Sequence, residues 1–235
     1  MNKEELKERL NGDLLCYSGR QPKFTADDVI KVLEDYENKI IPNDINQKFL
    51  NYFSIRDAFI ETQGFALVTN KWIKPLAEMI GDGKCLEVMA GKGTLSYALQ
   101  QQGVNVKATD NYSWKRFDFT KLFTDVENID AVEAVKTYGK DIDYLIMSWP
   151  YIGQVCYNVV KELYDINPKA KVIYIGEPYG GCTACDKFFD FFYDLYKSEY
   201  GYEIDNDMII LEDEYKHWYG IHDYIYLFDF SKSKM

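Results

Sequence analysis

The chain has 235 residues, 47% of them hydrophobic, which is enough for one α/β domain with a sizeable core and a small extension. Its formal net charge is −11, from 27 basic and 38 acidic residues. Charge-driven binding to nucleic acid relies on lysines and arginines that neutralise phosphates. This balance therefore argues against broad nucleic-acid binding and disfavours duplex DNA as a partner, although a local basic patch is compatible with it.

The chain lacks the sequence features of a membrane or secreted protein. Its apolar runs are too short to span a bilayer, and its first residues, MNKEELKERLNGD, lack the apolar stretch of a secretory signal. We therefore expect a cytoplasmic protein without a membrane partner.

The cysteines and histidines do not form a recognisable metal or disulfide pattern. The five cysteines are an odd and scattered set, unlike a disulfide framework. Cys182 and Cys185 form a C-x-x-C without a second pair, so we expect ordinary thiols rather than a zinc or redox site. His217 and His222 do not share one helical face, and we assign them no metal role.

The first part of the chain is predicted to be helical. Residues 1–64 have mostly helical spacing, as in TADDVIKVLEDYENKI, where Thr25 can cap the helix. This extension either forms a lid or recognition cap or covers one edge of a sheet, and the main domain is predicted over 65–235. A further helix is predicted over 69–80, before the turn at 81–83.

From residue 84 onward, strands and helices alternate. Strands are predicted over 85–89, 104–109, 126–129, 142–147, 171–176, 207–214 and 222–230. Helices are predicted over 94–102, up to 138, over 157–164 and over 185–200. Near-continuous apolar strands that alternate with helices indicate a doubly wound, mostly parallel α/β sheet, whose last two strands can pair antiparallel. Such sheets bind ligands beyond the carboxyl ends of their strands, where the strand order reverses.

The stretch CLEVMAGKGTLSYALQQQGVNVKATD combines a strand, a glycine loop, a helix and a second strand that ends on Asp110. Gly91 and Gly93 lack Cβ atoms, so the chain can turn tightly and a ligand can approach the backbone. The helix that follows offers free N–H groups. Taken alone, a bare turn explains the two glycines nearly as well.

Two acids follow the next strands. Asp110 is either a carboxylate for ribose hydroxyls or a solvated turn residue before Asn111. Asp130 starts a helix, where it can cap the helix, accept a hydrogen bond from an adenine amino group, or do both.

These residues resemble the class I S-adenosylmethionine-dependent methyltransferases, over about residues 84–230. The first motif of that family matches Glu87-Val88-Met89-Ala90-Gly91-Lys92-Gly93, although Met89 stands where the family usually has its first glycine. The resemblance implies a Rossmann-like methyltransferase fold with seven strands, one of the closing pair antiparallel, and S-adenosylmethionine as the cofactor. The cofactor-binding residues it implies are Glu87, Ala90, Gly91, Gly93, Asp110, Asn111 and Asp130. A dehydrogenase-type Rossmann domain fits less well, because it requires glycine at the positions of Met89 and Ser96.

Ser148-Trp149-Pro150-Tyr151 follows the predicted strand 142–147 and resembles the family's fourth motif, found in enzymes that methylate planar nitrogen atoms. The Ser148 side chain and the Trp149 carbonyl can accept hydrogens from a conjugated amine, Pro150 stiffens the turn, and Tyr151 can stack on the acceptor. The alternative is a strand-to-loop turn with packed aromatics. The neutral Ser148, and Trp149 in place of the commoner proline, leave the acceptor open among a nucleobase, a protein amide and a small molecule.

We therefore expect an S-adenosylmethionine-dependent methyltransferase that acts on nitrogen, with Ser148, Trp149, Pro150 and Tyr151 as its catalytic residues. A non-catalytic module that keeps the fold and binds the cofactor or a partner is the alternative.

Overall fold

The computed structural model describes most of the main domain. The described residues are 56–57, 59–61, 63–196, 208–215, 217–218 and 221–232. Almost all of the predicted helical extension over 1–64 lies outside them, so the extension and its boundary stay predictions.

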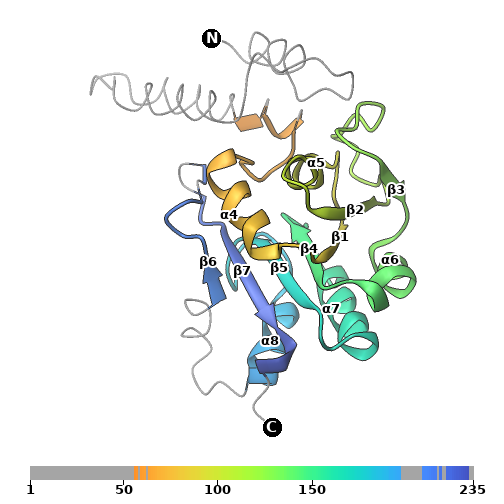
Figure 1. Ribbon diagram of the computed structural model, residues 1–235, viewed down its shortest axis with the longest axis vertical. Coiled ribbons are helices and arrows are strands. Elements are labelled where there is room, and N and C mark those ends of the chain that lie inside the picture. Colours follow the sequence, from red (N-terminus) through yellow and green to blue (C-terminus); the bar gives the residue numbers. More distant parts are fainter. Residues whose placement is uncertain are drawn as a thin grey trace.

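A seven-stranded sheet forms the centre of the domain, in the order β3-β2-β1-β4-β5-β7-β6 (Figure 1). Its strands are β1 (Lys84–Val88), β2 (Asn105–Asp110), β3 (Val126–Asn128), β4 (Tyr144–Ser148), β5 (Lys171–Gly176), β6 (Ile209–Ile210) and β7 (Tyr224–Asp229). The first five pair in parallel, and β7 is antiparallel to both of its neighbours. The predicted fold class, a mostly parallel sheet with an antiparallel strand near its end, is confirmed.

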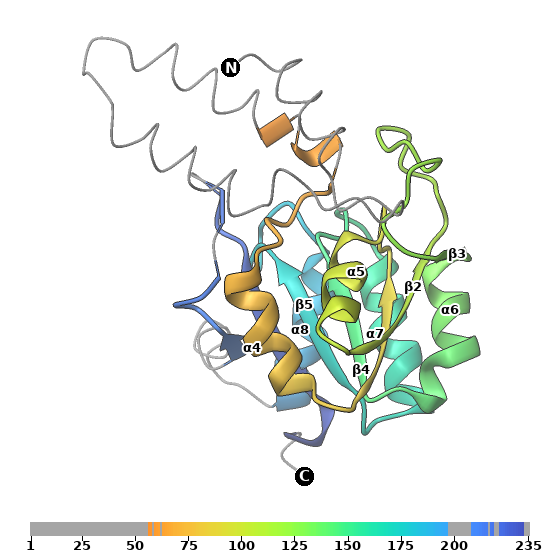
Figure 2. The same cartoon turned by 45° about the horizontal axis from the view of Figure 1, so that its top comes forward.

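Helices cover both faces of this sheet (Figures 1 and 2). They are α4 (Asn70–Ile80), α5 (Thr94–Gln101), α6 (Ala131–Tyr138), α7 (Val155–Ile166) and α8 (Asp186–Tyr196). One core layer is formed with α6, α7 and α8, and the other with α4 and α5. Alternate residues of β5 enter opposite layers: Val172 and Tyr174 join the first, and Ile173 and Ile175 the second. This alternation is why the strand is apolar from Val172 to Ile175.

Some predicted boundaries differ from the observed ones. The strand predicted over 142–147 is observed over Tyr144–Ser148, and a short 3-10 helix over Gly139–Asp141 precedes it. The strand predicted over 207–214 is mostly wrong: β6 has two residues, and Leu211 then turns the chain with a left-handed φ of 55°. Four residues of the helix predicted over 185–200 lie outside the described residues.

The strand order reverses between β1 and β4, which pair side by side in the middle of the sheet. The loops that leave the carboxyl ends of these strands diverge to opposite sides, which creates a crevice at that edge. The glycine loop follows β1 and the Ser148 turn follows β4, so both predicted motifs converge there.

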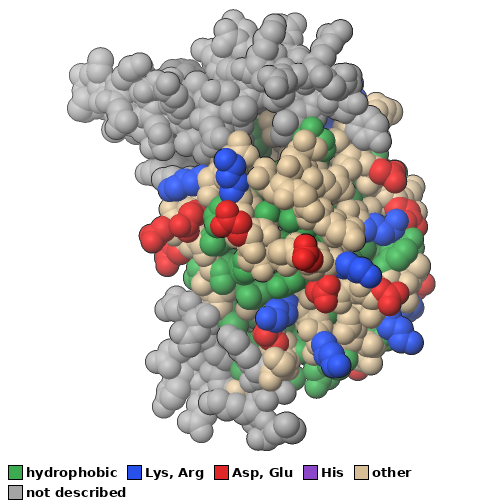
Figure 3. All heavy atoms as spheres, in the orientation of Figure 1, with side chains coloured by type: hydrophobic (Ala, Val, Ile, Leu, Met, Phe, Trp, Pro, Cys, Tyr) green, Lys and Arg blue, Asp and Glu red, His purple; other side chains and the backbone are tan. Residues whose placement is uncertain are grey.

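The described residues contain no helix that is long and apolar enough to cross a membrane. On the face shown in Figure 3, acidic and basic side chains of the described residues are interspersed rather than gathered by sign.

Candidate functional site

A pocket of about 390 Å³ lies at the reversal point of the sheet. It is lined by the loop after β1, the end of β2, the start of α6 and the turn after β4. The predicted site residues on its wall are Glu87, Ala90, Gly91, Asp110, Asn111, Asp130, Ser148, Trp149, Pro150 and Tyr151. Gly93 is the one predicted site residue that the structure does not place there. Motifs separated by some sixty residues therefore share one cavity.

The two glycines of the loop have different surroundings. Gly91 has φ 57°, and a Cβ there would lie 2.8 Å from Cε2 of Phe117, so the bare backbone admits this aromatic ring at the pocket. Gly93 has φ 77°, and its Cβ would lie 2.8 Å from Cγ2 of Val126 and 2.9 Å from Cγ2 of Thr124. Gly93 thus packs the start of α5 against the β3 side of the sheet.

Met89 adopts the backbone conformation of a glycine. Its φ is 56°, in the left-handed region, which costs an L residue about 1–2 kcal/mol. This is the position where the resembled family has its first glycine. The departure therefore concerns the side chain, which lines the pocket and packs partly against the core, and not the path of the backbone.

Asp110 holds the glycine loop in place. Its Oδ2 accepts a hydrogen bond from the N–H of Gly91 at 2.8 Å, and its Oδ1 accepts one from the N–H of Tyr112 at 2.7 Å. Burial raises the pKa of Asp110, and the two N–H groups oppose that rise. Because its side chain is 9% exposed, the alternative of a solvated turn residue does not hold. Each carboxylate oxygen keeps capacity for a further donor from a ligand.

Glu87 lies at the bottom of the same loop and is 1% exposed. Its Oε2 accepts from the Ser96 N–H at 3.0 Å and from the Ser96 hydroxyl at 2.5 Å. Burial raises the pKa of Glu87 to about 7, against the lowering effect of these bonds. Glu87 therefore joins β1 to the first turn of α5. Sequence reasoning missed Ser96, whose partner could be found only after the helix was placed over the strand.

Two further polar residues of the pocket lining, Asp130 and Asn111, also have structural roles. Asp130 caps α6, where its Oδ1 accepts from the Val132 N–H at 2.9 Å. Asn111 accepts from the Ser113 N–H at 3.0 Å through its side-chain oxygen. Both residues are exposed at the pocket, so the cap predicted at Asp130 is confirmed and its second oxygen is left for another donor.

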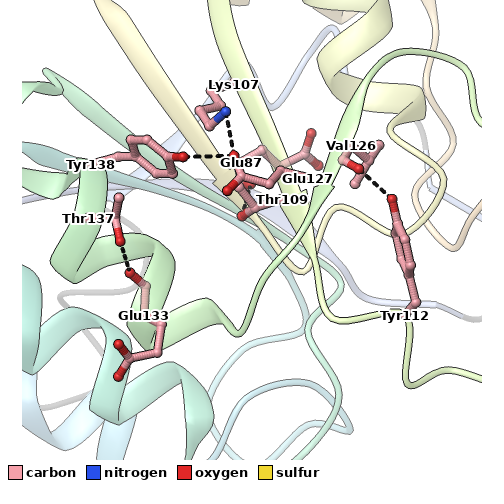
Figure 4. A network of polar contacts seen from close by, with 9 residues as sticks. All are labelled: Glu87, Lys107, Thr109, Tyr112, Val126, Glu127, Glu133, Thr137 and Tyr138. Carbon is pink, nitrogen blue, oxygen red and sulfur yellow. Dashed lines mark hydrogen bonds and ion pairs between the residues drawn. The ribbon is translucent and has the colours of Figure 1, made fainter.

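Polar contacts join β2, β3 and α6, the elements next to Asp110 and Asp130 (Figure 4). Lys107 of β2 pairs with Glu127 of β3 at 2.6 Å, and the Tyr138 hydroxyl of α6 donates to Glu127 at 2.7 Å. The Tyr112 hydroxyl donates to the Val126 carbonyl of β3. These contacts fix β2, β3 and α6 relative to one another. They therefore also fix the positions of Asp110, at the end of β2, and of Asp130, at the start of α6.

The turn after β4 is held in an unusual conformation. Trp149 has φ 50°, and its N–H donates to the Ile175 carbonyl at 2.7 Å. Its indole is stacked on the Phe65 ring, with centroids 5.5 Å apart and planes 12° from parallel. Tyr151 is 57% exposed at the mouth of the pocket, and forms a backbone bridge with Thr183. The turn therefore presents the fixed ring of Trp149 and the accessible ring of Tyr151.

Sequence reasoning missed an aromatic wall around Phe65. Trp114 and Phe117 contact its ring with centroids 6.0 and 6.2 Å away, and all three residues line the pocket. Phe65 precedes α4, while the other two follow β2, so no local pattern joins them. The only signal was the density of aromatic residues after Asn111.

Within the described residues, no group of three or more histidine, cysteine, aspartate and glutamate side chains could hold a metal ion. Cys182 and Cys185 are free thiols.

No family model and no curated protein matches the chain. Among solved structures, the chain is similar to a ribosomal protein L11 methylase from Lactobacillus delbrueckii subsp. bulgaricus, at 17% identity over 46% of this chain and 59% of that one, with a TM-score of 0.33. It is also similar to the magnesium protoporphyrin IX methyltransferase ChlM from Synechocystis PCC 6803 with bound SAH, at 12% identity over 75% of this chain and 86% of that one, with a TM-score of 0.43. A third similar structure is TehB from Haemophilus influenzae, at 11% identity over 74% and 66% of the two chains, with a TM-score of 0.39. The chain spans less than two thirds of the length of the L11 methylase. Because all three TM-scores are below 0.5, the function has to be inferred from the site itself.

Proposed function

We propose that the protein is an S-adenosylmethionine-dependent methyltransferase that transfers a methyl group to a nitrogen of a planar acceptor. The observation that carries this proposal is the shared pocket: the Gly91 loop, Asp110 and the Ser148–Tyr151 turn line one cavity at the reversal point of the sheet. A loop that would bind the cofactor and a turn that would orient an acceptor therefore border the same cavity.

The residues present fit the cofactor. The backbone of Ala90 and Gly91 lines the pocket, and the carboxylate of Asp110 keeps acceptor capacity for ribose hydroxyls. Glu87 and Asp130 line the same pocket, where Glu87 would help to hold the methionine end and the second oxygen of Asp130 would accept from the adenine amino group. When bound, S-adenosylmethionine supplies a methyl group that its sulfonium sulfur already activates.

The chain's own groups would orient the acceptor. A conjugated amine is a poor nucleophile because its lone pair is shared with the π system. The Ser148 hydroxyl and the Trp149 carbonyl would accept its two hydrogens and favour a tetrahedral nitrogen, which frees the lone pair for attack. Pro150 fixes the turn, and the exposed Tyr151 ring would stack on the acceptor plane. Most of the rate enhancement would come from alignment, since no strong base is required before transfer.

The same pocket disfavours a nicotinamide-dependent oxidoreductase. The third glycine of a dinucleotide-binding loop lets its helix pack closely on the strand. Here Ser96 occupies that position, and its hydroxyl is engaged with the buried Glu87. The neutral Ser148, and Met89 in place of the first glycine, are the features that favour a non-catalytic module as the second candidate.

Cofactor binding is tested by calorimetry with S-adenosylmethionine, S-adenosylhomocysteine and NAD. We expect both sulfur ligands to bind and NAD not to. Asp110→Ala should weaken the binding of S-adenosylhomocysteine by about 10- to 100-fold, which is what the loss of hydrogen bonds to a charged group costs. Asp118→Ala is the matched control, because Asp118 also accepts a backbone N–H two residues on, at 3.0 Å, but lies outside the pocket lining. Wild-type protein that binds neither sulfur ligand would refute the proposal.

Catalysis is tested separately from binding. The protein is incubated with methyl-labelled S-adenosylmethionine and pools of nucleosides, peptides or cell lysate, and formation of S-adenosylhomocysteine is followed. Turnover with one pool identifies the class of acceptor. Binding of the methyl donor without turnover in any pool would favour the non-catalytic module.

A further inference from the structure

A buried carboxylate outside the predicted motifs contacts the Trp149 side chain. Asp223 lies directly before β7 and is 1% exposed. Its Oδ2 accepts a hydrogen bond from the Trp149 indole N–H at 2.7 Å and another from the Tyr215 hydroxyl at 2.6 Å. Residues 74 positions apart are thus joined behind the turn that follows β4.

Trp149 is held from several sides. Its backbone is in the left-handed region and its N–H is bonded to β5, while Phe65 stacks on its indole. The Arg56 guanidinium lies 5.7 Å from the centre of the indole ring. A left-handed conformation of a bulky residue persists only where the surroundings impose it, and such residues concentrate at functional sites.

Asp223 is a costly residue for this position if it serves stability alone. Its Oδ1 is buried and has no hydrogen-bond partner among the described residues. Burial raises the pKa of Asp223, and the bonds from Tyr215 and Trp149 oppose that rise. The carboxylate satisfies two donors, the Trp149 indole N–H and the Tyr215 hydroxyl, at the cost of its own desolvation, and in doing so it fixes the direction of the indole N–H.

We propose that Asp223 is a positioning residue for methyl transfer, which acts through the Trp149 indole to fix the direction of the Trp149 carbonyl. The carbonyl belongs to the same residue as the clamped ring, so rotation of the turn would move both. This inference rests on the proposed function, in which that carbonyl accepts a hydrogen from the acceptor nitrogen. Asp223 itself would touch neither the cofactor nor the acceptor.

Sinefungin is a suitable probe, because it carries an amine on a carbon in place of the methyl-bearing sulfonium. In the proposed site this amine would meet the Ser148 hydroxyl and the Trp149 carbonyl, whereas S-adenosylhomocysteine has no group there. The ratio of the two dissociation constants, measured by calorimetry, therefore reports how well the acceptor-binding groups are placed. It needs no knowledge of the natural acceptor.

We expect the wild-type protein to prefer sinefungin by about tenfold or more. Asp223→Val should abolish this preference and leave S-adenosylhomocysteine affinity within about threefold of wild type. Asp223→Asn keeps an oxygen for the indole and should retain the preference. Trp149→Phe removes the N–H donor but keeps an aromatic ring, so it should match Asp223→Val, and the double variant should lose no more than either single one.

The outcomes separate this inference from the proposed function. Wild-type protein that binds no sulfur ligand refutes the proposed function. Three results overturn the positioning role. The first is wild-type protein that binds S-adenosylhomocysteine without preferring sinefungin, the second is an Asp223→Val variant that keeps the preference, and the third is an Asp223→Val variant that binds both ligands more weakly by the same factor. If circular dichroism shows that Asp223→Val does not fold, Trp149→Phe decides: an unchanged preference in that variant overturns the inference.

Discussion

Replacing Gly93 by alanine tests whether this glycine serves packing, as its surroundings indicate. The new Cβ would lie 2.8 Å from Cγ2 of Val126 and 2.9 Å from Cγ2 of Thr124. Neither neighbour is free to move, because Val126 is buried in β3 and the Thr124 hydroxyl donates to the Gln100 side chain at 2.7 Å. Gly103 is the matched control, since its φ of 87° is also left-handed but nothing lies within 4 Å of its Cβ position.

The two variants separate backbone strain from steric overlap. A left-handed alanine costs about 1–2 kcal/mol at either position. Overpacking against Val126 and Thr124 should add about 1–3 kcal/mol at position 93 alone. For a domain of this size, 1 kcal/mol lowers the melting temperature by about 2–4 °C, so Gly93→Ala should melt about 2–12 °C below Gly103→Ala.

Urea denaturation and calorimetry of both variants measure this difference. Equal free energies of unfolding for the two variants would refute the packing role. Because Gly93 does not line the pocket, Gly93→Ala that is still folded should bind S-adenosylhomocysteine within about threefold of wild type. A selective loss of affinity for S-adenosylhomocysteine would instead show that Gly93 contributes to cofactor binding.

Two further expectations concern titratable groups of the pocket. The pKa of Glu87 rises from 4.5 to about 7 on folding, so the native state binds the proton more tightly, and the stabilisation is full below pH 4.5 and lost as pH rises through 7. The glutamine of Glu87→Gln does not titrate. In urea titrations, the free energy of unfolding of this variant minus that of wild type should therefore increase by up to about 3 kcal/mol between pH 4.5 and 8. A difference between the two proteins that is independent of pH would contradict this. Burial and the Glu177 carboxylate raise the pKa of Cys182 to about 11, so at pH 8 its alkylation by iodoacetamide should be at least about tenfold slower in the native protein than in urea, which peptide-resolved mass spectrometry can check. Equal rates in the two states would show that the thiol does not experience this environment.

The fold was predictable because its signals are local. The run of apolar residues in β5 and the alternation of strands with helices identify a covered parallel sheet without knowledge of any contact. The β6 prediction failed because the apolar run from Met208 to Leu211 reads as a longer strand, while the left-handed φ of Leu211 ends the strand after Ile210.

The candidate site was predictable where its residues follow strands. Asp110 and Ser148 each end a strand, so topology alone brings them to one edge. Asp223 precedes its strand and Phe65 precedes a helix, and both reach Trp149 only through the folded chain. The packing role of Gly93 was hidden for the same reason, since the atoms that exclude a Cβ come from Thr124 and Val126.

The reversed polarity of β7 changes which part of the chain can contribute to the ligand-binding edge. Where strands run in the common direction, residues arrive at that edge as the chain leaves the sheet. On β7 they arrive as the chain enters the sheet, which is why Asp223, directly before this strand, reaches the Trp149 side chain. When distant relatives of this protein are compared, the few positions upstream of this strand therefore belong with the ends of the other strands in a search for determinants of acceptor choice.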